Sequence, residues 1–150
     1  MRNFQFLERS DTLSTKGMAA TSHPLATLEA ISILKKGGNA IDAAIAASTV
    51  LSVVEPNATG IGGDCFAIIA MNGKKPISYN GSGIAPEKAK TDFFINNKIN
   101  KIELDSPHSV TIPGALHAWS TIHNDHGKLE FEQLFLKAID CARDGFNITE

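Results

Sequence analysis

Residues 39–66 read NAIDAAIAASTVLSVVEPNATGIGGDCF, and this stretch decides the fold. From Ala40 to Val54 almost every side chain is apolar and many are alanine, so a helix here has no wet face and must pass through the middle of the molecule. At about 15 residues it is shorter than the roughly 20 that a bilayer requires. The sequence therefore predicts a buried central helix.

The start of this helix carries a capping signal. Asn39 stands at the first position and Asp42 follows three residues later, in an arrangement like a capping box. In such a box the carboxylate reaches back to a free backbone amide at the start of the helix. Asp42 is therefore predicted to be a helix cap and not a catalytic acid.

The glycines after the helix, Gly60, Gly62 and Gly63, raise the question of a phosphate-binding loop. Such loops place their glycines after a strand and before a helix, whereas these enter an apolar run that starts at Cys65 and is typical of a strand. We interpret them as a tight turn, in which glycine lets the backbone cross closely. Glu55 is either a buried hydrogen-bond acceptor or a solvated loop acid, and the apolar residues before it and the proline after it favour the acceptor.

The sequence before the central helix predicts a strand and then an amphipathic helix. Residues 18–21 are a short apolar stretch, and Ser22 followed by Pro24 is typical of a helix start with serine as the cap. Apolar side chains then recur at three-residue spacing as far as Leu34, as one buried face requires. Gly37 permits the backbone angles of a stop.

After the glycine turn, the sequence predicts a hairpin followed mainly by helices. The two strands are expected over residues 65–71 and 76–79, joined by a turn-rich link. The later elements are expected to be short helical pieces over 86–90 and 91–95, a surface loop over 96–105, a strand over 110–112, and helices over 115–123 and 131–142.

Composition and charge limit the class of protein. With 150 residues, 43% of them apolar, the chain has material for a substantial core and is predicted to be globular. Its 14 basic and 16 acidic side chains leave a net charge of -2 without a run of lysines, which argues against a nucleic-acid partner. Charges interrupt any apolar run among the first fifteen residues, so we expect no membrane partner and a cytoplasmic location.

The histidine, aspartate and cysteine residues form no recognisable catalytic or metal-binding motif in the sequence. His123 and His126, close to Asp125, suggest a metal pair, but they match no zinc motif and are better explained as polar residues at a helix end. Cys65 and Cys141 are too few and too far apart for a disulfide framework or a paired-cysteine zinc site. We therefore expect neither a metal nor a cofactor.

Several segments, taken together, resemble one known family. They are Ala20–Thr27, Lys36–Ala44, Val54–Pro56, Gly60–Gly63, Ala85–Pro86, Ile112–Gly114, Gly127–Leu129 and Ala142–Phe146. Their order and spacing are similar to the start of the γ-glutamyltranspeptidase (glutathione hydrolase) family, and the likeness covers residues 17 to 146. It implies an N-terminal extension over residues 1–16 and the N-terminal part of a large subunit over residues 17–150.

The resemblance implies an N-terminal-nucleophile hydrolase. Members of this family are proenzymes that cut themselves into a large and a small subunit and expose a threonine, which is the nucleophile and, through its own α-amine, the base. The implied fold is α+β, a four-layer αββα sandwich that this chain covers only in part. The threonine is expected beyond residue 150, so no catalytic residue is assigned. The implied partners are the missing small-subunit portion and a small-molecule amide or γ-glutamyl substrate.

One departure from the family pattern concerns the substrate. Just before Ala85-Pro86, γ-glutamyl enzymes carry an arginine, which binds the α-carboxylate of the glutamyl group, and then a glutamate; here Ser82 and Gly83 stand in these places. Ser82 and Gly83 are therefore the candidate substrate-binding residues, in a form that resembles the branch of amidohydrolases and acylases.

This departure makes amide hydrolysis with poor use of glutathione the expected function. Ser82 taken alone is a conceivable nucleophile, but a loop serine with no partner histidine is usually a turn residue. The alternatives are a pseudoenzyme or substrate-binding module of the same fold, or a structural fragment with no activity of its own.

Overall fold

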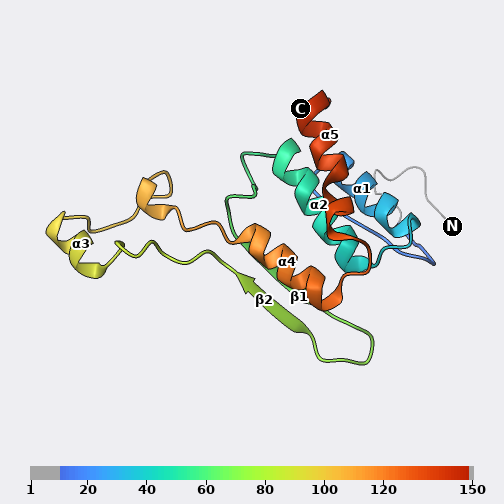
Figure 1. Ribbon diagram of the computed structural model, residues 1–150, viewed down its shortest axis with the longest axis horizontal. Coiled ribbons are helices and arrows are strands. Elements are labelled where there is room, and N and C mark those ends of the chain that lie inside the picture. The colour runs from blue at the N-terminus through green and yellow to red at the C-terminus, as the bar shows by residue number, and fades with distance from the viewer. Residues whose placement is uncertain (1–10, 149–150) are drawn as a thin grey trace, which may run out of the picture.

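The computed structural model describes residues 11–148 (Figure 1). The predicted extension over residues 1–16 falls largely on residues 1–10, which lie outside the described residues. The helices and strands follow in the order α1 (Pro24–Lys35), α2 (Ala40–Val54), β1 (Cys65–Ile69), β2 (Ile77–Gly81), α3 (Thr91–Asn96), η1 (Pro107–Ser109), α4 (Ala115–His126), η2 (Phe131–Phe135) and α5 (Leu136–Asp144).

Helix α2 is the centre of the helical part, as the sequence predicts, but it is not buried on every side, because Ala40 and Ala44 are exposed. It contacts α1, α4, α5 and η2. Ala46 and Val50 are fully buried, and Ala26 and Ala30 of α1 belong to the same core cluster. Because alanine side chains are short, helices that meet through them can approach closely. The run of small apolar residues thus explains why one helix has neighbours on several sides.

The predicted capping box at the start of α2 is confirmed. The side-chain oxygen of Asn39 accepts hydrogen bonds from the amides of Ile41 at 2.8 Å and Asp42 at 3.0 Å. In return, the Asp42 carboxylate accepts a hydrogen bond of 2.9 Å from the Asn39 amide. These bonds satisfy backbone donors that the first turn of a helix otherwise leaves free.

Strands β1 and β2 form the predicted antiparallel hairpin, with Cys65 opposite Gly81 and Ile69 opposite Ile77. Side chains alternate between the two faces of a strand. One face packs against the helical core and α4, which lies alongside the hairpin in Figure 1. The other face carries Phe66 and Ile68, which are 68% and 80% exposed. The described residues therefore form one helical layer on one face of a two-stranded sheet, in agreement with an α+β sandwich covered in part.

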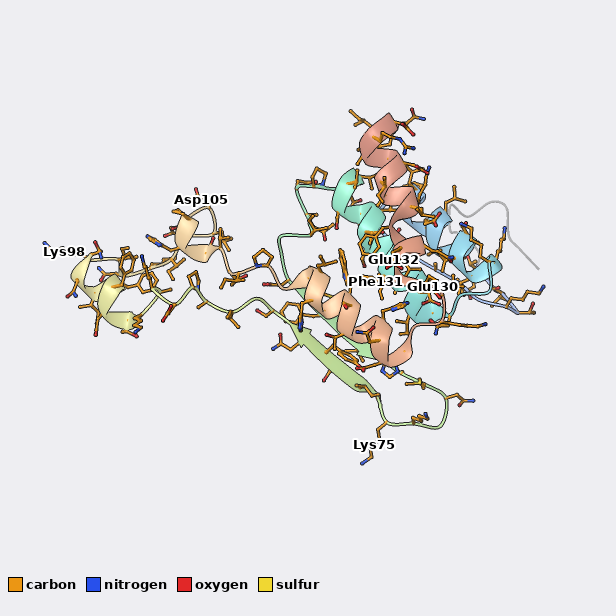
Figure 2. All side chains as sticks on the ribbon, in the orientation of Figure 1. Lys75, Lys98, Asp105, Glu130, Phe131 and Glu132 are labelled. Carbon is orange, nitrogen blue, oxygen red and sulfur yellow. The ribbon has the colours of Figure 1, made fainter. Side chains whose placement is uncertain are left out.

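Residues 84–112 reach away from the rest of the molecule, and we call them the arm (Figure 1). Lys98 and Asp105 lie toward its far end in Figure 2. Within the arm, the rings of Phe93, Phe94 and His108 pack against one another at centroid distances of 5.3 to 5.6 Å. This small cluster holds α3 and η1 together.

Two predicted strands are wrong. Residues 18–21 and 110–112 are not in strands, because neither has a neighbouring strand to pair with among the described residues. Residues 110–112 make one backbone hydrogen bond to a neighbouring segment, as a strand would, from the Ile112 amide to the Ile84 carbonyl at 3.0 Å. The predicted helical piece over 86–90 is also wrong, since it forms only a turn closed by the Ala89 amide and the Pro86 carbonyl.

Helix boundaries also differ from the predictions, and α4 runs to His126, three residues past its predicted end. The segment predicted as a single helix over 131–142 begins as the 3-10 turn η2, and α5 starts only at Leu136. The Leu134 carbonyl accepts a bond of 2.9 Å from the Thr49 hydroxyl of α2, so this turn is tied to the core. At α1 the cap is His23 and not Ser22, because the ring Nδ1 of His23 accepts a bond of 3.2 Å from the Leu25 amide.

Candidate functional site

The two predicted substrate-binding residues, Ser82 and Gly83, follow directly after β2. The Ser82 amide donates to the side-chain oxygen of Asn80 at 3.0 Å, and its hydroxyl lies 3.4 Å from the Gly83 carbonyl oxygen. The Ser82 side chain is exposed. Within residues 11–148 its hydroxyl makes only this long local contact, which leaves it available to a ligand.

Asp64 contacts Gly83 directly and was not predicted as a site residue from the sequence. Its Oδ1 accepts a hydrogen bond of 2.7 Å from the Gly83 amide and one of 3.2 Å from the Thr111 hydroxyl. The carboxylate therefore joins the start of the hairpin to both ends of the arm. An acid placed directly between a glycine turn and a strand was the available signal, but its partners lie 19 and 47 residues away along the chain.

The start of α4 also packs against the residues around Asp64. The Gly63 carbonyl accepts hydrogen bonds from the amides of Gly114 at 3.0 Å and Ala115 at 2.9 Å. The first amides of α4 are thus occupied by backbone from the end of the glycine turn. We refer to residues 63–64, 81–83 and 111–115, which these bonds bring together, as the glycine junction.

The predicted tight turn at Gly60, Gly62 and Gly63 is present, closed by a hydrogen bond of 3.1 Å from the Gly63 amide to the Gly60 carbonyl, but the closest backbone approaches involve other glycines of the glycine junction. A Cβ atom added to Gly60 or Gly62 would meet nothing within 4 Å. A Cβ on Gly83 would overlap the Ile112 carbonyl, and one on Gly81 would lie 2.8 Å from the Cys65 carbonyl oxygen and overlap the Cβ of Ala118. Glycine is the residue that allows such contacts. The junction therefore depends on Gly81 and Gly83 more than on the glycines that precede β1.

Glu55 is a hydrogen-bond acceptor, as predicted, but it is not buried as expected. Its Oε2 accepts a hydrogen bond of 2.6 Å from the Ser22 hydroxyl, and the residue is half-buried. This bond connects the end of α2 to the start of α1. Glu55 is therefore a hydrogen-bonded acceptor within the scaffold.

The two histidines at the end of α4 have protein partners. The Nε2 atom of His123 lies 2.7 Å from the Leu129 carbonyl oxygen, and that of His126 lies 2.8 Å from the Tyr79 hydroxyl. The same hydroxyl donates to Asp125 at 2.8 Å, and this bond raises the pKa of Tyr79. Within residues 11–148, no group of three or more histidine, cysteine or acidic side chains is arranged to hold a metal ion.

The two cysteines are free thiols. Cys141 is buried, and Cys65 at the start of β1 is half-buried. Burial raises the pKa of the Cys65 thiol, against a smaller opposite effect of Trp119. Since the thiolate is the reactive form, Cys65 is poorly suited to be a nucleophile.

His23 is a further polar residue in the core that the sequence analysis did not single out. It is 3% exposed, and its Nε2 atom has no hydrogen-bond partner among the described residues. Its ring meets that of Phe146 edge to face, with centroids 6.3 Å apart. The ring thus joins the cap of α1 to the segment after α5.

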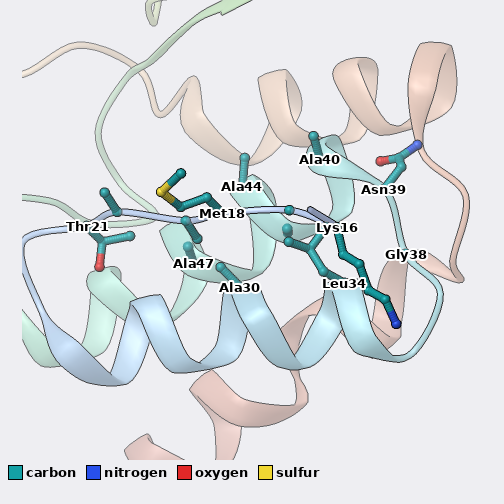
Figure 3. A pocket seen from close by; sticks show the side chains of 14 residues that line it. Lys16, Met18, Thr21, Ala30, Leu34, Gly38, Asn39, Ala40, Ala44 and Ala47 are labelled. Atoms are coloured by element: carbon teal, nitrogen blue, oxygen red, sulfur yellow. The ribbon is translucent and has the colours of Figure 1, made fainter. Parts of the chain in front are cut away.

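A hollow of about 500 Å³ lies between residues 16–21 and the two helices α1 and α2 (Figure 3). Its wall consists mainly of alanine and other apolar side chains, among them Met18 and Leu34. Among the described residues that line it, Lys16 is the one with an ionisable side chain. With no acid or base to pair with that lysine, the hollow lacks the groups that chemistry on a substrate requires. No helix in the described part of the chain has the length and apolar character to cross a membrane.

Comparison with known proteins finds relatives along most of the chain. The Gamma-glutamyltranspeptidase family matches residues 26–150. The Glutathione hydrolase-like YwrD proenzyme of Bacillus subtilis (strain 168) is 34% identical over 139 residues, which cover 91% of this chain and 26% of that protein. The chain thus spans about a quarter of the length of the curated relatives it matches.

Two solved structures are similar to this chain in both sequence and fold. The cephalosporin acylase from Bacillus halodurans has a TM-score of 0.85 and 39% identity, covering 98% of this chain and 28% of that one. The gamma-glutamyltranspeptidase from Pseudomonas nitroreducens, solved in complex with L-DON, has a TM-score of 0.82 and 33% identity, covering 92% of this chain and 42% of that one.

Proposed function

The chain belongs to the gamma-glutamyltranspeptidase family, and on this premise we propose that the full-length protein is a self-processing amide hydrolase or acyltransferase. The observation that carries the proposal is the family match over residues 26–150, together with relatives that are proenzymes. The α+β fold is that of N-terminal-nucleophile hydrolases, of which this chain forms part.

The proposed nucleophile is a threonine in polypeptide that follows residue 150. Self-cleavage would place it at a new N-terminus, where its own α-amine can take the proton from its hydroxyl. The hydroxyl oxygen then attacks the substrate amide, the amine leaves with a proton, and the acyl group stays on the threonine as an ester. Water or an acceptor amine finally takes the acyl group. The residues described above would contribute the layer that binds the acyl end of the substrate.

Ser82 is the basis for proposing which amides are used. An arginine in this place could grip a substrate carboxylate through two charge-assisted hydrogen bonds, whereas a serine offers one neutral donor. The difference corresponds to about 2 to 4 kcal/mol, or roughly a thirty- to a thousand-fold loss of affinity for a carboxylate-bearing acyl group. We therefore expect glutathione to be a poor substrate compared with amides whose acyl group lacks that carboxylate.

The proposal is tested on the full-length protein in two steps. Gel electrophoresis and N-terminal sequencing of the smaller product should show cleavage that starts at a threonine, and replacing this threonine with alanine should abolish it. Release of 4-nitroaniline from γ-glutamyl and 4-aminobutyryl anilides, which differ only in the α-carboxylate, should then favour the second or show no preference.

Two results would contradict the proposal in different ways. A protein that neither cleaves itself nor turns over any amide, yet binds one, would be a substrate-binding module of the same fold. A strong preference for the γ-glutamyl anilide would keep the enzyme and refute the proposed substrate class. The cytoplasmic location expected from the sequence stays a prediction, which cell fractionation would test.

A further inference from the structure

Asp64 places an exposed negative charge in the glycine junction, beside the proposed substrate-binding residues. Its Oδ1 lies 2.7 Å from the amide nitrogen of Gly83, the residue next to Ser82. Among residues 11–148, the ion pairs are formed by other acids, and no lysine, arginine or histidine pairs with Asp64. Its charge is therefore not neutralised by a partner in this part of the protein.

The backbone around Asp64 is held in position. The carbonyl of the preceding residue, Gly63, accepts two hydrogen bonds from the start of α4, and the following residue, Cys65, begins β1. On the side chain, Oδ1 takes the bonds from Gly83 and Thr111, while Oδ2 makes no hydrogen bond to the described residues. One oxygen therefore fixes the orientation of the carboxylate, and the other remains available to a ligand.

We propose that Asp64 is a specificity-determining residue, which disfavours acyl groups that carry a carboxylate next to Ser82 and favours those with a neutral or cationic end. This inference rests on the proposed function, because it assumes that the acyl end of the substrate binds beside Ser82 and Gly83. The proposed effect of Asp64 is distinct from the effect of lacking an arginine at position 82. A serine merely fails to attract a carboxylate, whereas a fixed acid repels one.

The size of the effect follows from Coulomb's law. Two like charges about 6 Å apart, in surroundings between water and a protein surface, repel each other enough to change KM by roughly threefold to tenfold. A protonated amine at the same distance is attracted to Asp64, which lowers KM by a similar factor. The charge acts on binding of the acyl end, so it should change KM more than kcat.

The test uses the full-length, self-cleaved protein and three 4-nitroanilides. The γ-glutamyl compound carries both an amine and a carboxylate, the 4-aminobutyryl compound only the amine, and the glutaryl compound only the carboxylate. The measured quantity is the ratio of kcat/KM between the glutaryl and 4-aminobutyryl anilides. Asp64→Asn removes the charge and keeps an oxygen that can accept from Gly83 and Thr111. We expect it to shift the ratio toward the glutaryl compound by about tenfold or more, because both single-charge effects add.

Two variants separate charge from positioning. Thr111→Val removes one hydrogen bond to Asp64 and keeps its charge, so the ratio should stay as in the wild type even if turnover falls. Glu132→Gln removes an exposed charge from η2, which is not part of the glycine junction, and controls for net charge. High salt should shrink the difference between wild type and Asp64→Asn, as it does for exposed charges.

The outcomes distinguish this inference from the function on which it rests. If the wild type turns over the 4-aminobutyryl anilide and Asp64→Asn leaves the ratio unchanged, Asp64 only positions the turn and the inference fails. If Thr111→Val shifts the ratio as much as Asp64→Asn, geometry and not charge sets the preference, and the inference also fails. If the wild type cleaves no anilide at all, the proposed function itself fails.

Discussion

The carboxylate of Asp42 accepts a hydrogen bond of 3.0 Å from the backbone amide of Lys128, 86 residues further along the chain. A second bond comes from the Leu129 amide at 3.3 Å, in addition to the bond from Asn39 at the start of α2. The side chain of Asp42 is fully buried. One acid thus connects the cap of the central helix to the segment that follows α4.

Replacing Asp42 with alanine should strongly destabilise the protein. It would leave three partly buried backbone amides without their acceptor, at a cost of about 2 to 4 kcal/mol. The expected result is a clear fall in the midpoint of urea or thermal unfolding of the full-length protein. Asp140→Ala is the control, because this exposed acid pairs only with Arg143 at the surface and should change stability by less than about 1 kcal/mol. Equal effects of both substitutions would refute the role assigned to Asp42.

Alanine substitutions at Gly83 and Gly62 should differ in their effect on stability. Gly83→Ala would drive a Cβ into the Ile112 carbonyl, and we expect a loss of at least about 2 kcal/mol in stability together with reduced turnover. Gly62→Ala meets open space, and Gly62 has no positive φ, so it should stay within about 0.5 kcal/mol of the wild type. Unfolding midpoints of the two variants, compared side by side, check this prediction. A well-folded Gly83→Ala protein would show that the junction is looser than described.

Glu29→Gln should stabilise the protein at neutral pH. Glu29 is 8% exposed, and burial raises its pKa above the usual 4.5, although Lys36 and Lys137 act in the opposite direction. The folded state thus holds this proton more tightly than the unfolded state, so the stabilising contribution is complete below pH 4.5 and is lost as the pH rises through the folded pKa.

The expected measurement is therefore a difference that depends on pH. The unfolding midpoint of Glu29→Gln should exceed that of the wild type at neutral pH, and the two should converge as the pH falls below about 4.5. Glu87→Gln, at an exposed position on the arm, serves as the control and should show little change at either pH. A difference that grows on acidification would contradict the prediction.

Ser82→Arg should improve the use of carboxylate-bearing acyl groups. A guanidinium at this place would restore two charge-assisted bonds to a substrate carboxylate, so KM for the γ-glutamyl anilide should fall by roughly thirtyfold or more. Asp64 stands close enough to compete for the new cation, and the double variant Ser82→Arg with Asp64→Asn should gain more than Ser82→Arg alone. Steady-state kinetics on the γ-glutamyl and 4-aminobutyryl anilides measure this. No change in KM for either variant would show that residue 82 does not meet the acyl end.

Residues 1–150 expressed alone should self-associate. One face of the hairpin exposes Phe66 and Ile68, a contiguous apolar surface of the kind that monomeric proteins seldom leave uncovered. Size-exclusion chromatography with light scattering should show oligomers or aggregates, and Phe66→Ser with Ile68→Ser should reduce them. A monomer with a cooperative thermal transition would contradict this expectation.

The sequence predicted best those features that depend on residues close together. The apolar run from Ala40 to Val54, the capping pair Asn39 and Asp42, and the hairpin that begins at Cys65 all depend on local spacing, and all are confirmed. The strands expected over 18–21 and 110–112 failed because a strand needs a neighbour, and pairing with distant polypeptide cannot be read from a short apolar run.

The candidate site shows the same limit. The resemblance predicts Ser82 and Gly83 as site residues, whereas the contact of Asp64 with the Gly83 amide is visible only in the folded chain. The tight turn from Gly60 to Gly63 was predicted correctly, but the glycines that pack most closely were not identified from the sequence. A Cβ at Gly60 or Gly62 would meet open space, whereas Gly81 lies against Cys65 and Ala118, and Gly83 lies against Ile112 at the base of the arm.

The arm leaves and returns to the glycine junction at nearly the same point, because the Ile112 amide binds the Ile84 carbonyl at 3.0 Å. A loop that is clamped at its base can change its length at the tip for little entropic cost, since closure depends only on the logarithm of the number of residues. The tip, with α3 and η1, is therefore the part of this chain where insertions and deletions can accumulate during evolution while the body beneath keeps its geometry.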